Sequence, residues 1–409
     1  MNKRPFIILS AFLLLFSLIE KGQATETYRP ETSVAGFIQL PGSGRQVYNF
    51  NPGWRFFRGD VQGAEAVNFD DRSWNVVSTP HTVELMPAEG SGCRNYQGPA
   101  WYRKHFVLPA ETKGQRVVLH FEAAMGKQIL YLNGKRIQEH LGGYLPFTLD
   151  LTANGVQAGD SCLLAVFTDN SDDKSYPPGK RQYTLDFAYH GGIYRDVWMI
   201  AKSPVAITDA IDSQTVGGGG VFVHFDKISE KSAQVYVNTE VQNDDARFES
   251  VTVETTLTDA DGKVIKRSSG KLSLKPGEKK SIRQQMEVKN PTLWSPDTPY
   301  LYRVQSRIKK GNKSIDGGIT RVGIRLAEFR GKDGFWLNGK PFGQLVGANR
   351  HQDFAYVGNA LPNSQQWRDA KRLRDAGCTI IRVAHYPQDP AFMDACDELG
   401  LFVIVATPG

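Results

Sequence analysis

The 409-residue chain has few cysteines and no concentration of charge of one sign. Its four cysteines (Cys93, Cys162, Cys378 and Cys396) stand far apart in apolar surroundings, which predicts buried thiols rather than a disulfide scaffold. The 49 basic residues exceed the 43 acidic ones only slightly and are interspersed with them, so no nucleic-acid partner is indicated. A content of 40% hydrophobic and 22% charged residues excludes a disordered chain, a collagen-like fibre and a multi-span membrane protein.

The N-terminus has the pattern of an export signal. Lys3 and Arg4 precede the apolar run Phe6–Ile19, which is too short to span a bilayer comfortably. The Gly-Gln-Ala that ends at Ala24 fits the small-x-small cleavage rule. We therefore predict a signal peptide over residues 1–24, cleaved after Ala24, and a periplasmic or secreted protein with no stable membrane anchor. An uncleaved anchor is the alternative.

Two β domains are predicted next. Residues 48–203 contain short runs of strand formers such as Val117–Phe121, a hairpin signal at Asn133-Gly134, and many aromatic residues, which together favour a jelly-roll-like β-sandwich. Residues 204–326 show strands at a spacing of about 8–12 residues, with a further hairpin signal at Asp261-Gly262. This spacing predicts an immunoglobulin-like sandwich without the cysteine pair of antibody domains.

Residues 327–409 change to a β-α-β-α-β pattern. In chain order the pattern gives a strand at Leu345–Gly347, a helix capped by Asn363 and ended by Gly377, a strand at Thr379–Val383, a helix from Asp389-Pro390 to Gly400, and a strand at Leu401–Val405. Continuous apolar strands alternating with amphipathic helices imply a parallel sheet that is buried on both faces. Three such strands leave an open edge, so we expect this last domain to be incomplete.

Six short phrases along the chain resemble glycoside hydrolase family 2, which contains β-galactosidases, β-glucuronidases and β-mannosidases. They occur in the family order at Phe50–Trp54, Phe69–Trp74, Gly191–Val197, Trp294–Tyr302, Gly347–His351 and Arg382–Pro387. The resemblance covers about residues 49–409. It implies that the third domain is the start of a TIM (β/α)8 barrel, whose active site lies at the carboxyl ends of the strands.

The resemblance also implies a sugar-binding site on this rim. The substrate-binding residues that it implies are Asp186, Asn349, His351 and His385, with Arg350 and Arg382 in supporting positions. His351 and His385 come directly after the first and second strands, and a neutral imidazole can both donate to and accept from a sugar hydroxyl. From the residues alone, a structural histidine in a turn, or a capped turn at Asp186, is the alternative interpretation.

By the same resemblance the chain is part of an exported glycoside hydrolase that cleaves β-linked glycosides with retention. Retaining enzymes need two carboxyl groups about 5–5.5 Å apart. In the family both are glutamates from later barrel strands, so we expect them beyond Gly409, predict no catalytic residue within this chain, and expect the chain alone to be inactive. No cofactor is predicted, and the sequence Val405-Ala406-Thr407 puts the galactosidase-type Mg²⁺ site in doubt because many members carry an acidic residue there.

Other interpretations stay open at this point. A non-catalytic carbohydrate-binding protein, in which the two sandwiches bind the sugar, is the alternative function, and a structural surface protein without sugar affinity is a third. The acidic stretch Asp169–Asp173 is either a Ca²⁺ loop or a solvated loop. The expected partner is a β-linked oligosaccharide, and a homo-oligomer is expected from the family.

Overall fold

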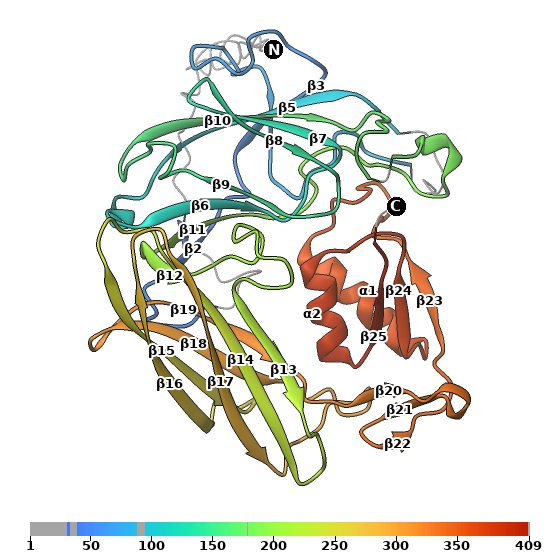
Figure 1. The fold of residues 1–409 in the computed structure, drawn as a ribbon. Coiled ribbons are helices and arrows are strands. Elements are labelled where there is room, and N and C mark those ends of the chain that lie inside the picture. Colours follow the sequence, from blue (N-terminus) through green and yellow to red (C-terminus); the bar gives the residue numbers. More distant parts are fainter. Residues whose placement is uncertain (1–30, 33–38, 88–94, 178, 408–409) are drawn as a thin grey trace, which may run out of the picture.

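The computed structural model describes residues 31–32, 39–87, 95–177 and 179–407 (Figure 1). The predicted signal peptide and Cys93 lie outside these ranges. Within them, the structure contains no helix whose length and hydropathy would suit a membrane crossing. Figure 1 shows three parts in chain order: a β-sandwich, a second β-sandwich, and a small β/α unit near the C-terminus.

The first sandwich consists of two sheets. One has the strand order β1 (Glu31–Thr32), β2 (Gln46–Asn49), β11 (Val197–Lys202), β6 (Arg116–Phe121) and β9 (Phe147–Asp150). The other has the order β4 (Asn75–Val77), β3 (Trp54–Arg58), β5 (Pro99–Val107), β10 (Ser161–Asp169), β7 (Lys127–Leu132) and β8 (Lys135–Leu141). The 3-10 turns η1 (Ala110–Thr112) and η2 (Gln182–Thr184) lie in its connections. Alternate side chains of both sheets point inward and form one apolar core, as a jelly-roll-like sandwich requires.

Aromatic residues dominate this core. Trp54, Tyr102 and Phe106 are fully buried, and Phe50 contacts Trp54 edge-on at a centroid distance of 5.8 Å. The hairpin signal between β7 and β8 is confirmed, because Asn133 and Gly134 adopt φ values of 50° and 81°.

The second sandwich has two four-stranded sheets. In one, β14 (Ser232–Asn243) pairs with β12 (Val205–Ile207), β13 (Val221–Asp226) and β17 (Lys279–Lys289). The other has the order β16 (Val264–Leu274), β15 (Glu249–Thr258), β18 (Tyr302–Lys310) and β19 (Lys313–Val322). The predicted hairpin at Gly262 joins β15 to β16. This arrangement confirms an immunoglobulin-like fold.

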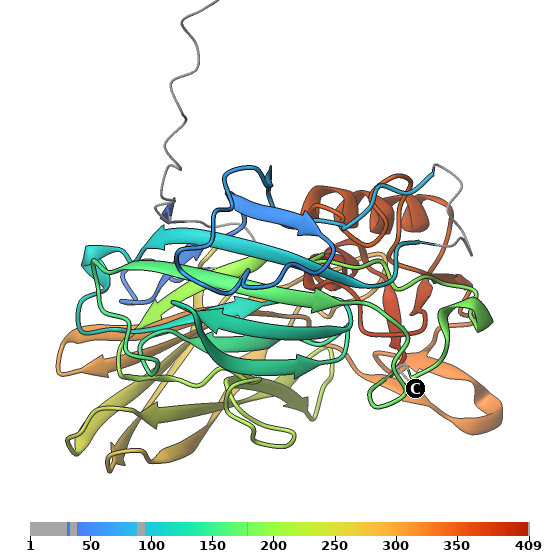
Figure 2. The same ribbon diagram turned by 90° about the horizontal axis from the view of Figure 1, so that it is seen from above.

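The C-terminal unit confirms the predicted β-α-β-α-β order. A small sheet of β20 (Ala327–Phe329), β21 (Phe335–Leu337) and β22 (Lys340–Pro341), with the turn η3 (Gly331–Asp333), precedes it. Then follow β23 (Gly347–Arg350), α1 (Asn363–Asp375), β24 (Ile380–Val383), α2 (Pro390–Leu399) and β25 (Phe402–Val405). The three strands β23, β24 and β25 pair in parallel in that order. Figures 1 and 2 both place this unit beside the first sandwich.

Two local predictions in this unit were wrong. The first parallel strand begins at Gly347 rather than Leu345, and Leu345 instead packs before the strand against the apolar cluster that contains Trp294 and Phe402. Asn363 does not cap α1: it is the first helical residue, and its Nδ2 donates a 2.9 Å hydrogen bond to Asp196 of the first sandwich. The cap at Asp389, by contrast, is confirmed, since its Oδ1 accepts from the backbone N–H of Ala391 at 2.8 Å.

The two faces of the parallel sheet are not equally buried. Helices α1 and α2 pack on one face through Ala370, Phe392 and Cys396, which are buried. On the other face, the apolar cluster that contains Trp294 covers the amino ends of the strands. Ile404, near the carboxyl end of β25, is 51% exposed. The prediction that both faces are buried therefore does not hold for the described residues. Cys162 and Cys396 are buried free thiols, as predicted, and Cys378 is a half-buried one.

Candidate functional site

Three of the predicted site residues come together from two parts of the chain. Asp186 lies in the loop after η2 of the first sandwich, His351 directly follows β23, and His385 follows β24. One carboxylate oxygen and one nitrogen of each ring lie within 4.8 Å of one another. The carboxyl ends of two parallel strands thus meet a loop of the neighbouring domain at one point.

Aromatic rings hold these side chains in place. Phe187, next to Asp186, stacks on His351 at a centroid distance of 5.4 Å and lies 5.7 Å from His385. Tyr386 lies 5.4 Å from Phe187 and stacks face to face on Tyr144 of the first sandwich at 4.1 Å. The histidines are therefore packed against rings contributed by the first sandwich as well as by their own unit.

The electrostatics favour a neutral His351. Burial lowers the pKa of its imidazole below the usual value; Asp353 and Asp186 raise the pKa, and His385 and Arg382 lower it. At neutral pH the ring can therefore both donate and accept a hydrogen bond. Its Nδ1 lies 3.4 Å from the Tyr386 hydroxyl, which restricts the orientation of the ring.

The other predicted residues divide between the two faces of the parallel sheet. Asn349 lies within β23, not after it as predicted, and is exposed on the face away from the helices, in register with Arg382 of β24. Arg350 points to the helix side and is buried, with its guanidinium 4.0 Å from the ring centre of Phe392. It also donates to Asp369 of α1 at 2.7 Å.

Arg195, which the sequence analysis did not single out, joins the first sandwich to both histidine loops. It is 2% exposed, and its Nη2 donates to Gln352 Oε1 at 2.9 Å and to the Pro387 carbonyl at 2.8 Å. Gln352 follows His351 and Pro387 comes two residues after His385, so one guanidinium contacts the backbone neighbourhood of both rings. The only sequence signal was the position of Arg195 within the family-like phrase Gly191–Val197.

Three buried carboxyl groups act on one another, and two of them, Asp389 and Glu122, also interact with this guanidinium. Asp389 Oδ2 is 4.0 Å from Arg195 Nε, Asp196 accepts from Asn51 and Asn363, and Glu122 accepts from the Trp198 indole. Burial, with repulsion from Asp389, raises the pKa of Asp196 to about 6 and also raises that of Glu122, and burial raises the pKa of Asp389 itself. This carboxyl cluster (Glu122, Asp196 and Asp389) lies where the first sandwich packs on the β/α unit.

In the described part of the chain, Asp186, His351 and His385 are the one group of three or more His, Cys, Asp or Glu side chains with metal-compatible spacing. The acidic stretch Asp169–Asp173, for which a Ca²⁺ loop and a solvated loop were the two interpretations, accepts hydrogen bonds from nearby backbone N–H groups. Asp172 accepts from the backbone N–H of Gln182 at 2.9 Å, and Asp173 accepts from that of Ser175 at 2.8 Å.

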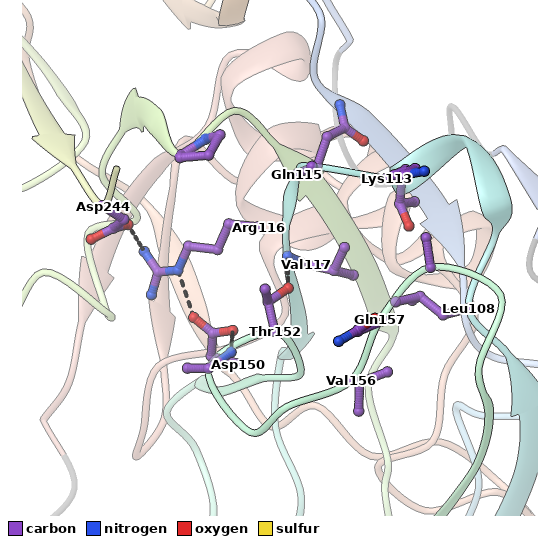
Figure 3. A pocket seen from close by; sticks show the side chains of 15 residues that line it. Leu108, Lys113, Gln115, Arg116, Val117, Asp150, Thr152, Val156, Gln157 and Asp244 are labelled. Carbon is purple, nitrogen blue, oxygen red and sulfur yellow. Dashed lines mark hydrogen bonds and ion pairs between the residues drawn. The ribbon is translucent and has the colours of Figure 1, made fainter. Parts of the chain in front are cut away.

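A cavity of about 780 Å³ lies elsewhere, at the side of the first sandwich that faces the second (Figure 3). Leu108, Val117 and Val156 form part of its wall, and none of the predicted site residues lines it. Arg116 at its edge is engaged by Asp150 at 2.6 Å, and by Asp212 and Asp244. Its cation is thus already neutralised by protein carboxylates, which leaves this cavity without a free guanidinium for a ligand.

Comparisons with known proteins agree with the three-part fold. Residues 57–204 match the family model "Glycosyl hydrolases family 2, sugar binding domain", residues 219–325 match "Glycosyl hydrolases family 2", and residues 329–409 match "Glycosyl hydrolases family 2, TIM barrel domain". A β-galactosidase of Thermoanaerobacter pseudethanolicus is 35% identical over 367 residues, which cover 90% of this chain and 47% of the relative. A β-glucuronidase of Formosa agariphila is 32% identical, over 90% of this chain and 38% of the relative.

Solved structures give the same picture. A crystal structure of a Bacteroides uniformis β-glucuronidase superposes with a TM-score of 0.80 at 32% identity and covers 89% of this chain and 42% of its own. Another β-glucuronidase of the family gives a TM-score of 0.83, over 91% of this chain and 40% of its own. The chain therefore spans less than half the length of these proteins.

Proposed function

The chain belongs to glycosyl hydrolase family 2, and we propose that it forms the substrate-binding part of an exported hydrolase of β-linked glycosides. One observation carries the proposal: Asp186, His351 and His385 meet within 4.8 Å at the carboxyl ends of two parallel strands. In barrels of this kind the carboxyl ends of the strands carry the active site. The proposed export rests on the N-terminal sequence pattern.

The site has the chemistry of a hydroxyl-binding cradle. The Asp186 carboxylate accepts hydrogen bonds from two neighbouring sugar hydroxyls, and the imidazoles of His351 and His385 bind further hydroxyls. Phe187 contributes an apolar ring beside these polar groups, which suits the C–H face of a sugar. Asn349, exposed on β23 two residues before His351, offers a further polar group near the carboxyl end of this strand.

Catalysis in this proposal follows the retaining double displacement. One carboxylic acid protonates the leaving oxygen, the second forms a glycosyl–enzyme, and water then hydrolyses that intermediate. Both groups would be glutamates from barrel strands that follow those described. The residues of this chain bind and orient the sugar, and we expect the 409-residue chain alone to show no turnover of nitrophenyl β-galactoside or β-glucuronide. Turnover above that of a mock purification would refute this division of roles.

The relatives are a β-galactosidase and β-glucuronidases by name, so methyl β-galactoside and methyl β-glucuronide are the sugars to test first. Their dissociation constants are measured by ligand-observed NMR for the wild type and for Asp186→Asn and His385→Ala. Losing a hydrogen bond to a charged group costs about 1.5–3 kcal/mol, so we expect Asp186→Asn to weaken binding about tenfold to a hundredfold.

His224→Ala is the matched control, because this histidine also stacks on an aromatic ring, Tyr236, but lies on β13 of the second sandwich. It should leave sugar binding unchanged. Binding that survives both Asp186→Asn and His385→Ala would instead favour the non-catalytic alternative, in which the sandwiches themselves bind the sugar. Absence of binding to both glycosides would contradict the cradle.

A further inference from the structure

We propose that Asp186, His351 and His385 also form a binding site for a divalent transition metal of the zinc class. The three side chains offer one oxygen and two nitrogens, and these atoms lie within 4.8 Å of one another. Two imidazoles and one carboxylate are a ligand set that zinc takes in proteins, with a further position left for water. The proposal rests on these side chains and does not require that the site binds a sugar.

The spacing allows a shared ion after a modest closing movement. Zinc binds histidine nitrogen and carboxylate oxygen at about 2.0–2.2 Å, so in its tetrahedral sites two ligand atoms lie about 3.4 Å apart. The ligand atoms here lie within 4.8 Å of one another, so the widest pair has to approach by at most about 1.4 Å. Asp186 is exposed on a loop, whereas the two rings are half-buried at the ends of strands. We infer that the imidazoles are the fixed ligands and that the carboxylate closes on the ion.

The surroundings of His351 support its role as a ligand. Its Nδ1 lies 3.4 Å from the Tyr386 hydroxyl, so Nε2 is the nitrogen left for a metal. A ligating histidine commonly uses its other nitrogen in this way, to a partner that fixes the tautomer and the ring orientation. Phe187, stacked on the ring at 5.4 Å, further restricts its motion.

The local charge is also suitable for a dication. The charged groups that act on His351 are the carboxylates of Asp186 and Asp353 and the guanidinium of Arg382. Two negative charges against one positive charge leave a net charge of about −1 from these side chains beside the two rings. Because two of the three protein ligands are imidazoles, the site should select zinc, cobalt, nickel or copper over Mg²⁺ and Ca²⁺, which prefer oxygen ligands.

The test is a titration of the untagged, chelator-treated 409-residue chain with zinc chloride by isothermal calorimetry, and with cobalt chloride by absorption spectroscopy. We expect one ion per chain. His351→Ala and His385→Ala should abolish the site, and Asp186→Asn should weaken zinc binding at least about tenfold, since even the loss of an outer partner typically costs 10–100-fold. Because Asp186 is exposed, this last substitution leaves the fold intact, and a thermal melt of each variant verifies folding.

His224→Ala, in the second sandwich, is again the control and should retain full zinc affinity. The wild type binding no zinc, or zinc binding that persists in both histidine variants, would overturn the proposal. A cobalt spectrum with sulfur charge-transfer bands would also overturn it, because it would place the metal at a thiol such as the half-buried Cys378. Competition by Ca²⁺ at equal concentration would overturn the inferred selectivity. These measurements use no sugar, so they can confirm the metal site even if the proposed sugar binding is refuted.

Discussion

The substitution Arg195→Met tests how the first sandwich holds the histidine loops. Methionine fills much of the space of the arginine stem but has no N–H donors and no charge. The change removes the bonds from Arg195 to Gln352 and Pro387 and leaves Asp389 without its neighbouring guanidinium. Both side chains are almost fully buried, since Arg195 and Asp389 are each 2% exposed.

Two independent estimates of the loss in unfolding free energy agree. Two hydrogen bonds from a charged donor contribute about 1.5–3 kcal/mol each. Removing one partner of a buried ion pair costs about 3–5 kcal/mol. We therefore expect Arg195→Met to lower the free energy of unfolding by about 3–5 kcal/mol, a large share of the 5–15 kcal/mol that typically stabilises a domain. We also expect the substitution to weaken the packing of the β/α unit on the first sandwich.

The assay follows urea unfolding by circular dichroism together with binding of methyl β-galactoside or methyl β-glucuronide. Arg195→Met should lower the urea concentration at the midpoint of the first unfolding transition. It should also weaken sugar binding at 25 °C, at urea concentrations where the sandwiches are still folded. Arg136→Met is the control: its pair with Glu139, at 2.6 Å, is exposed, so its loss should change stability by less than about 1 kcal/mol.

A second variant separates the effect of the lost hydrogen bonds from the effect of the Asp389 carboxylate that is left without its cation. Arg195→Met combined with Asp389→Asn removes the unpaired carboxylate but keeps an N-cap at the start of α2, since asparagine caps as well as aspartate. The double variant should recover part of the loss. A single variant with wild-type midpoint and wild-type sugar binding would refute the view that Arg195 positions the two loops.

Two further predictions concern the same interface and the parallel sheet. Folding raises the pKa of Asp196 from 3.8 to about 6, so the folded state binds the proton more tightly and stability falls as pH rises between these values, by about 3 kcal/mol for this group. The wild type should therefore gain melting temperature relative to Asp196→Asn when the pH is lowered from 7 to 5, and parallel pH profiles would contradict this. Gly347→Ala should destabilise the chain by about 1–3 kcal/mol, because its Cβ would meet the Ile380 carbonyl of the neighbouring strand. Gly318→Ala, with open space at its Cβ, should be neutral in the same denaturation experiment, and equal effects of the two changes would exclude the steric explanation.

The order of the three parts and many local elements could be predicted because they depend on neighbours in sequence. The hairpin at Asn133-Gly134 needs two residues that tolerate positive φ, and the start of α2 needs an aspartate before a proline. Such signals are local and therefore visible in the chain itself. The resemblance to the family supplied the pairing of Asp186 with the two histidines, which no local pattern contains.

The wrong and missing predictions share one physical cause, which is contact between distant parts of the chain. Asn363 has a good capping residue type, yet its amide binds Asp196, 167 positions away. Arg195 looks like a surface cation in a polar phrase, and its burial follows only from the docking of two domains. Phe187 has the pattern of an ordinary apolar residue, and only the fold shows that its ring contacts both histidines.

These long-range contacts give the first sandwich a direct part in the site. Asp186 and Phe187 reach the site from its loop, Tyr144 stacks on Tyr386, and Arg195 binds beside both histidines. The β/α unit contributes the rings, but their orientation depends on groups that fold with the sandwich. A buried carboxyl cluster with raised pKa values lies at the same contact, so proton uptake there and the geometry of the site should change together. A change that loosens this contact should therefore weaken ligand binding at Asp186, His351 and His385 even where it touches none of them.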